Sequence, residues 1–245
     1  GRTVLFTAAH HANEWITATV LLKFAEELSR AILEKGQVYG IPANLFEENC
    51  QIFLVPMVDP DGVDLVTGGI AQGSIQWEQA KRLSNNCPSI PFPNGWKANL
   101  LGVDLNLQYP AGWLQAREIK FSQGYTRPGP RDYVGKAPLT QRESRALADF
   151  TSYLDPALIL AYHTQGEQIY WKYDDIDVPG ALALGQEFAR LSGYSLEKTP
   201  YASGFAGYKD WFIKVWRRPG FTIEAGLGEN PLPISQFDTI YAKNL

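Results

Sequence analysis

The chain is poor in the residues on which several classes of protein depend. It has only two cysteines, Cys50 and Cys87, which excludes a disulfide-dense scaffold and a zinc site built from four cysteines. Positive charge is not in excess, since 22 Lys and Arg face 26 Asp and Glu, which argues against a nucleic-acid binder. No apolar run approaches the roughly 18–20 residues that a membrane-spanning helix needs. The 245 residues therefore suit one large globular domain, or two small ones at most.

Short apolar runs alternate with helical patterns along the chain. Five runs have the composition of strands: residues 3–9, 50–58, 157–162, 168–173 and 220–225. Apolar residues three or four positions apart predict three helices: residues 15–35, 181–191 and 209–215. A capping-box sequence at 140–143 predicts another helix to about Leu154. This alternation favours an α/β fold with a largely parallel sheet.

Two long segments carry no clear period. Residues 66–100 and 110–138 are rich in residues that form turns, among them Gly, Pro, Asn and Ser. A long irregular segment inside a compact domain is usually functional or poorly ordered. Both segments are predicted to lack regular secondary structure.

Histidine is scarce, and two of the three histidines fall at strand ends. His10 and His11 follow the first predicted strand, and His163 ends the third. Glu14 comes shortly after His11, and Glu224 lies near the end of the fifth predicted strand. In open α/β sheets, ligands bind at the carboxyl ends of the strands. These side chains could therefore converge in one crevice.

Two imidazoles and one carboxylate suit a catalytic zinc site. Such a zinc keeps its fourth position for water, lowers the pKa of that water and polarises a substrate carbonyl. A second carboxylate that does not bind the metal can take the proton of the water and pass it to the leaving amine. Each residue also has a plain alternative: a solitary His-x-x-Glu is usually no metal site, His163 could be a core histidine, and Glu224 could belong to a buried ion pair.

Six sequence blocks add a family resemblance to this zinc-site hypothesis. They are His11-Ala12-Asn13-Glu14-Trp15, Pro60-Asp61-Gly62, Gly102-Val103-Asp104-Leu105-Asn106, Ala161-Tyr162-His163, Ala202-Ser203-Gly204 with Asp210-Trp211, and Phe221-Thr222-Ile223-Glu224. In this order they resemble the zinc carboxypeptidases of the carboxypeptidase A type, over most of the chain. The resemblance implies a mixed, mostly parallel sheet of about eight strands with helices on both faces. It also implies a single metallopeptidase catalytic domain over residues 1–245, which we expect to be truncated at both ends.

The resemblance assigns the chemistry to particular residues. His11, Glu14 and His163 are implied as the ligands of one zinc ion per chain, and Glu224 as the general base. The family spacing His-x-x-Glu selects His11 as the ligand and not His10. His10 is then expected to be a packing or supporting residue. Asp104 matches the aspartate that hydrogen-bonds the first zinc histidine, although it could also be a simple turn residue.

Further matched residues bear on the substrate. Asn106 matches a residue that binds a substrate carboxylate, and Tyr201 matches the mobile tyrosine over the cleft, with Tyr208 as its competitor. Lys97 lies about where the family has its oxyanion-stabilising arginine. Lys209 lies at the floor of the family's specificity pocket, which suggests an acidic group on the substrate. Each match has a plain alternative. Asn106 could cap a turn, and either tyrosine could pack at the surface. Lys97 and Lys209 could be solvated surface lysines.

One departure from the family changes the expected substrate. Exopeptidases of the family follow the residue at Asn106 with an arginine that grips a C-terminal carboxylate, and this chain has Leu107. The stretch from Gly102 to Trp113 looks most like a bacterial branch, the γ-D-glutamyl-diaminopimelate peptidases, which cut peptidoglycan stem peptides. Diaminopimelate carries an extra carboxylate and amine, and Lys209 could pair with that carboxylate.

The hypothesis is a zinc peptidase that hydrolyses the γ-D-glutamyl-diaminopimelate bond of peptidoglycan stem peptides. One alternative is a general zinc metallocarboxypeptidase that removes C-terminal residues. Others are a non-catalytic peptidoglycan-binding module and a metal-dependent deacylase of small amino-acid conjugates. We expect neither a nucleic-acid partner nor a membrane span, and the bacterial cytoplasm and the cell wall both stay open as the compartment.

Overall fold

A mixed sheet forms the centre of the computed structural model, which describes residues 1–244. Its strands lie in the order β4-β1-β5-β8-β6-β7, with the bounds Cys50–Val55, Arg2–Ala8, Leu158–His163, Gly220–Glu224, Gln168–Tyr170 and Ser195–Glu197. Neighbouring strands are parallel except for β6 and β8. The expected mixed, mostly parallel sheet is therefore confirmed.

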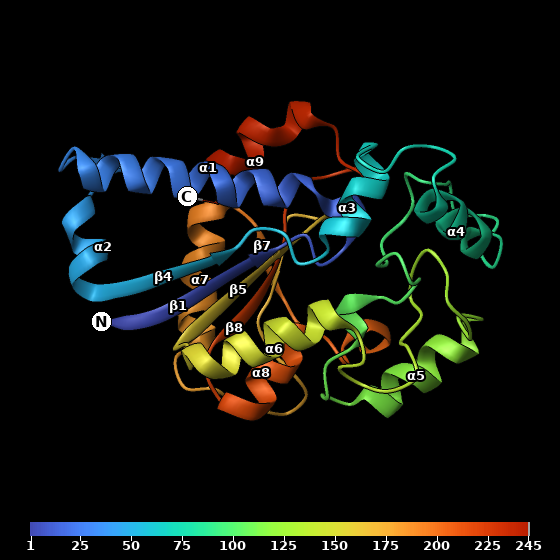
Figure 1. Cartoon of the computed structure of the whole chain (residues 1–245). Helices are drawn as coiled ribbons and strands as arrows, with labels where there is room; N and C mark the ends of the chain where they lie inside the picture. Colours follow the sequence, from blue (N-terminus) through green and yellow to red (C-terminus); the bar gives the residue numbers. More distant parts are fainter. Residues whose placement is uncertain (245) are drawn as a thin grey trace.

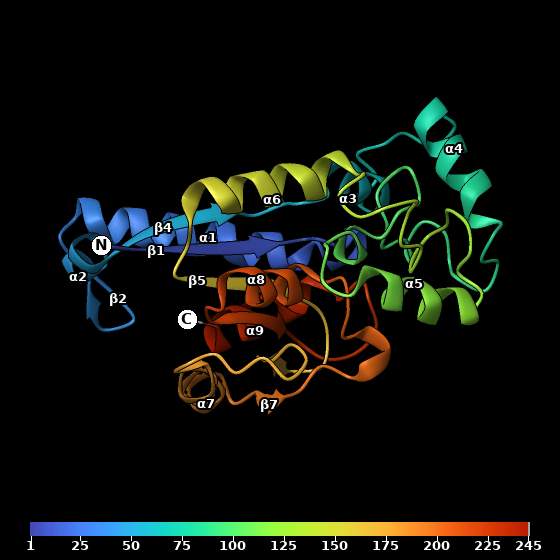
Figure 2. The same cartoon turned by 90° about the horizontal axis from the view of Figure 1, so that it is seen from below.

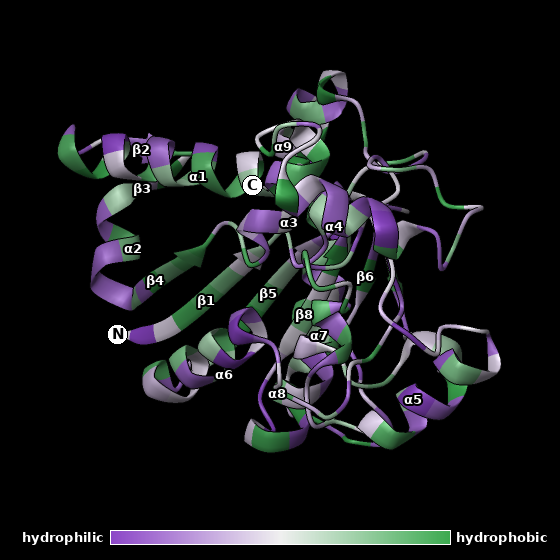
Figure 3. Ribbon diagram, turned by 45° about the vertical axis from the view of Figure 1, so that its right-hand side comes forward, coloured by the Kyte–Doolittle hydropathy of each residue, from purple (hydrophilic) through white to green (hydrophobic). Residues whose placement is uncertain are grey.

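Helices cover both faces of this sheet (Figure 1). One face packs against α6 (Arg142–Leu154) and α8 (Tyr208–Trp216), and the other against α1 (Ile16–Leu33), α7 (Ala181–Ser192) and α9 (Phe237–Lys243). Successive residues of β5 alternate between the faces, because Ile159 packs with the first group of helices and Leu160 with the second. Strands covered on both sides have continuous apolar sequences, which explains why the strand runs are visible in the sequence and in Figure 3.

The sheet is smaller than the resemblance implied. About eight strands were expected, whereas six join the main sheet in the part of the chain that the structure describes. The short strands β2 (Gln37–Val38) and β3 (Ile41–Pro42) pair only with each other. Along its outer edge, β4 takes no strand partner from residues 1–244, so this side of the sheet ends there.

The predicted helices are present, but one predicted cap is wrong. The helices expected over 15–35, 181–191, 209–215 and up to Leu154 correspond to α1, α7, α8 and α6. The N-cap residue of α6 is Gln141, without a side-chain cap, rather than Thr140. The Thr140 hydroxyl and backbone amide both donate to the side-chain oxygen of Gln108, so a tertiary partner replaces the local cap. None of the helices within residues 1–244 combines the length and apolar character of a membrane span.

Residues 68–140, which we call the loop lobe, lie beyond the carboxyl end of the sheet (Figure 2). Two helices there were predicted as loop: α4 (Ile75–Ser84) and α5 (Trp113–Ser122). Outside the loop lobe, two further helices were also not predicted: α2 (Ala43–Asn49) and α3 (Pro60–Thr67). The periodicity missed α4 and α5 because each is short and fully buries few residues, Ala80 and Ser84 in α4 and Ala116 in α5. The apolar residues beside them, such as Trp77 and Trp113, are only partly buried in small clusters, so the apolar stripe of each helix is short. One local signal was available, since the Ser74 side chain accepts a hydrogen bond from the Trp77 amide at the start of α4.

Candidate active site

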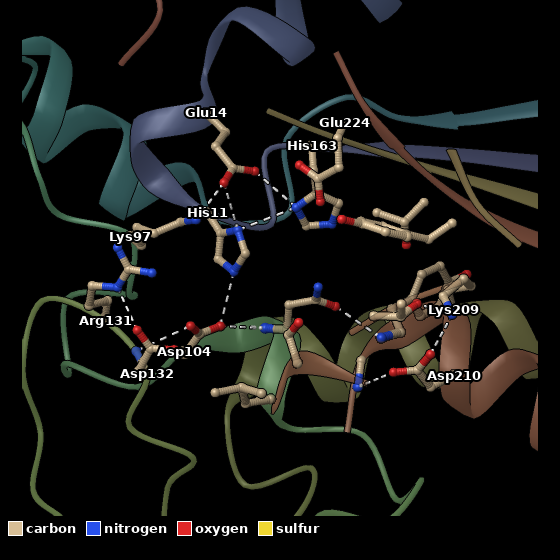
Figure 4. Close-up of a pocket in the computed structure, with 18 of the residues that line it drawn as sticks. His11, Glu14, Lys97, Asp104, Arg131, Asp132, His163, Lys209, Asp210 and Glu224 are labelled. Atoms are coloured by element: carbon tan, nitrogen blue, oxygen red, sulfur yellow. Dashed lines mark hydrogen bonds and ion pairs between the residues drawn. The ribbon is translucent and has the colours of Figure 1, made fainter. Parts of the chain in front are cut away.

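Three side chains expected to bind a metal meet at the ends of adjacent strands. His11 and Glu14 follow β1 directly, Glu14 within the 3-10 turn Ala12–Glu14, and His163 is the last residue of β5. Because β1 and β5 are parallel neighbours, their carboxyl ends lie at the same edge of the sheet. Figure 4 shows the three side chains pointing toward one another.

The distances among these three groups fit a small cation. His11 Nδ1 is 3.0 Å from Glu14 Oε1, and His163 Nδ1 is 2.9 Å from Glu14 Oε2. The two Nδ1 atoms are 3.3 Å apart, and one ligand atom from each residue lies within 4.8 Å of the others. All three residues are buried. Two imidazole nitrogens and a carboxylate are a donor set that zinc prefers.

Asp104 sets the orientation of the first of these ligands. Its Oδ1 lies 3.1 Å from His11 Nε2, which leaves His11 Nδ1 facing the other two groups. Burial lowers the pKa of His11, but the charges of Glu14 and Asp104 outweigh this and raise it to about 9. Burial likewise works to raise the pKa of Asp104, but His11 and the nearby lysines hold it below its usual value. The field of these carboxylates therefore attracts a positive charge at this point.

Glu224 ends the third strand that reaches the site. It lies opposite His163 in the β5–β8 pairing and lines the same cavity. Burial and the negative charge of Glu14 raise the pKa of Glu224, while His163, Lys97 and His11 pull it down. Its carboxyl group is thus poised to exchange a proton nearer to neutral pH than an ordinary glutamate.

Lys97 reaches the site from the loop lobe. Its Nζ is 2.8 Å from Glu14 Oε1, and its backbone oxygen accepts a hydrogen bond from the Ala12 amide at 3.1 Å. This backbone bond joins the lobe to the turn Ala12–Glu14, which carries one of the expected metal ligands. Burial lowers the pKa of Lys97, but Glu14 outweighs it and raises the pKa, so the side chain stays positively charged.

The residues expected to bind substrate are placed differently from one another. Asn106 lines the cavity, and its Oδ1 accepts the Tyr208 amide at 2.9 Å. Tyr208 also lines the cavity but is fully buried, and its hydroxyl is 2.8 Å from that of Thr151. Tyr201 is 74% exposed and packs on Phe205 outside the metal cavity, so the structure does not bring it to the metal ligands.

Lys209 lies in the cavity, but its ammonium already has partners. Its Nζ is 2.6 Å from Asp210 Oδ1, 2.7 Å from the Lys172 backbone oxygen and 3.2 Å from Thr199 Oγ1. The contacts to Lys172 and Thr199 are hydrogen bonds, and the contact to Asp210 is an ion pair. A substrate carboxylate at Lys209 would have to compete with these three partners.

Sequence reasoning missed a cluster of three charged residues in the cavity. Arg131, Asp132 and Lys120 all line it, and none was singled out from the sequence. The Arg131 Nε donates to Asp132 Oδ2, and Lys120 Nζ lies 2.6 Å from Asp132 Oδ1. The Asp132 amide in turn donates to Asp104 Oδ2 at 3.2 Å. The only local signal is an Arg-Asp pair in a loop rich in proline and glycine, which is too weak to predict a site.

The comparisons with known proteins show the family of the chain. The family model described as "Zinc carboxypeptidase" matches residues 1–245. Gamma-D-glutamyl-L-diamino acid endopeptidase 1 of Lysinibacillus sphaericus is 43% identical over 244 residues, which are 100% of this chain and 59% of that protein. Uncharacterized protein YqgT of Bacillus subtilis (strain 168) is 40% identical over 241 residues, which are 98% of this chain and 62% of that protein. The chain thus spans less than two thirds of the length of both relatives.

Solved structures with low sequence identity share the fold. Thrombin activatable fibrinolysis inhibitor matches with a TM-score of 0.73 at 17% identity, covering 99% of this chain and 59% of the other. Murein-tripeptide amidase MpaA of Escherichia coli O157 matches with a TM-score of 0.56 at 18% identity, covering 99% and 80%. With the family model matched from end to end, the chain belongs to the zinc carboxypeptidase family.

Proposed function

We propose that this protein is a zinc peptidase that hydrolyses the γ-D-glutamyl-diaminopimelate bond of peptidoglycan stem peptides, with residues 1–245 as its catalytic domain. The observation that carries the chemistry is the meeting of His11, Glu14 and His163 at two strand ends, with Glu224 beside them on a third. The printed name of the relative from Lysinibacillus sphaericus supports this substrate class. So does Leu107, which stands where exopeptidases of the family have the arginine that grips a C-terminal carboxylate.

The chain supplies a complete set of groups for hydrolysis. Bound to His11, Glu14 and His163, zinc would supply Lewis acidity for water and for the scissile carbonyl. Glu224 would take a proton from the attacking water and deliver it to the leaving amine, which its raised pKa favours. Lys97 would place a positive charge next to the oxygen on which negative charge develops.

The leaving amine would lie toward Asn106 and Lys209. The Oδ1 of Asn106 is held by the Tyr208 amide, so its Nδ2 is the group that would donate to a substrate carboxylate. Lys209 would bind the side-chain carboxylate of diaminopimelate in exchange for Thr199, its longest contact at 3.2 Å. Tyr201 would have to swing inward from the exposed rim to cover the substrate.

A general metallocarboxypeptidase is the second candidate, and one observation weighs against it. Leu107 is buried and packs in an apolar cluster with Ala116, Val134 and Ala206. An apolar side chain in this setting offers no partner for the C-terminal carboxylate that such enzymes grip.

A pair of peptides tests the proposal. The protein would be assayed with L-Ala-γ-D-Glu-meso-diaminopimelate and with an α-linked peptide of the same length that ends in an ordinary amino acid. We expect diaminopimelate to be released from the first peptide only, stoichiometric zinc by elemental analysis, and loss of turnover after chelation that added zinc restores. Faster cleavage of the α-linked peptide would favour the carboxypeptidase, and binding without product would favour a binding module.

A further inference from the structure

Arg131 is a cation of the cavity with unused hydrogen-bond donors. Within residues 1–244 its Nε donates to Asp132 Oδ2, and no acceptor lies within reach of its two terminal amino groups. The ammonium groups around it are committed, Lys97 to Glu14 and Lys120 to Asp132. A planar guanidinium held at Nε still presents donors that can bind a carboxylate.

Arg131 stands at one end of the cavity, and Lys209 stands at the other (Figure 4). A second hollow adjoins the metal cavity, and Arg131, Lys97 and Glu224 line both of them. Asn106 and Lys209 line the metal cavity and not the second hollow. A bound peptide would therefore extend from Lys209, past the metal ligands, toward Arg131 and the second hollow.

This layout places Arg131 on the acyl side of the scissile bond, and this placement rests on the proposed function. If the leaving amine lies toward Asn106 and Lys209, the acyl part of the substrate lies toward Arg131. When a glutamyl residue is linked through its side-chain carbonyl, its α-carboxylate stays free on that acyl part. A free anion then lies on the side where the structure has a guanidinium with open donors.

We propose that Arg131 is a specificity-determining residue that binds the free α-carboxylate of the γ-linked acyl residue. The Asp132 carboxylate holds Nε and is itself anchored by Lys120 and by the bond from its amide to Asp104. These contacts fix the guanidinium plane before the substrate arrives, so little conformational entropy is lost on binding.

Two substrates that differ in a single group test this role. One is L-Ala-γ-D-Glu-meso-diaminopimelate, and the other carries D-isoglutamine, in which a neutral carboxamide replaces the free α-carboxylate. Because hydrogen bonds to charged groups are strong, we expect the unaltered protein to prefer the carboxylate about 10- to 100-fold in kcat/KM. In Arg131→Gln we expect kcat/KM for the carboxylate substrate to fall to that for the carboxamide substrate, so that the preference disappears.

Controls separate this role from a structural one. Arg127→Gln removes an exposed charge from the same loop and should keep the preference. Arg131→Lys keeps the positive charge but lacks the paired planar donors of the guanidinium, so it should retain part of the preference. Equal cleavage of both substrates by the unaltered protein, an undiminished preference in Arg131→Gln, or an equal loss on both substrates would overturn the role of Arg131. Cleavage of neither substrate by the unaltered protein would instead overturn the proposed function, and this inference with it.

Discussion

The active site draws on two regions that are built in different ways. His11, His163 and Glu224 stand at the ends of hydrogen-bonded strands that helices cover on both faces. Lys97 and Arg131, by contrast, come from the loop lobe, which is held by a small apolar cluster around Trp96. The groups proposed for the metal and for proton transfer thus lie at the ends of the sheet strands or just beyond them, while Lys97 and Arg131 lie on loops. Such a division allows recognition to vary while the chemistry is retained.

The largest effect should come from a strand residue that acts in the chemistry. Glu224→Gln removes the proposed proton acceptor and keeps the shape of the side chain, so we expect turnover to fall about 100- to 10,000-fold. Zinc content should stay stoichiometric, because Glu224 is not among the proposed ligands. Steady-state rates with elemental analysis check this, and Glu118→Gln on exposed α5 is the control. A rate near that of the unaltered protein would mean that the sheet does not supply the base.

A core substitution in the lobe tests whether the two regions are separable. Trp96 is fully buried, so Trp96→Ala should lower the free energy of unfolding by about 3–5 kcal/mol. Hydrogen exchange should show faster exchange across residues 68–140, while amides of β1, β5 and β8 keep their protection. Leu101→Ala, at a residue that is 56% exposed in the same lobe, should change little. Equal loss of protection in both regions would show that they unfold as one unit.

The smallest of these effects should arise where the lobe touches a metal ligand. Asp104→Ala removes the hydrogen-bond partner that orients the ring of His11. We therefore expect zinc affinity to fall about 10- to 100-fold. Competition with a chromophoric chelator measures this, and Asp149→Ala on the exposed face of α6 is the matched control. Unchanged affinity would mean that the lobe contributes to substrate binding only.

Much of the sheet could be predicted from the sequence, and much of the lobe could not. Strands β1, β5 and β8 are covered on both faces, so burial leaves a continuous apolar run in each. Helices α4 and α5 fully bury few residues, so their apolar stripes are too short to mark a helix in the sequence. The resemblance overestimated the number of strands in the sheet, and Thr140 was wrongly expected to cap α6 because Gln108 engages it instead.

The candidate site divides in the same way. His11, Glu14, His163 and Glu224 could be proposed from their positions at strand ends, since strand ends in a parallel sheet meet at one edge. Arg131 could not be proposed, because no local pattern marks a loop arginine that turns toward a distant cavity. The contacts of Lys209 with Lys172 and Thr199 were equally invisible, since these two residues lie on other segments of the chain.

The sequence by itself determined the positions of five of the six strands of the main sheet in the described residues, the family and the residue types available for the metal, because burial and local motifs leave their record in adjacent positions. Only the tertiary structure decided which charged groups reach the cavity and which of them keep a free donor. The reason is physical: a side chain's hydrogen-bonding capacity depends on the partners that the fold brings to it. Lys209 and Arg131 are both cations in the same cavity, and only the fold shows that the first is engaged by three partners and the second by Asp132 alone.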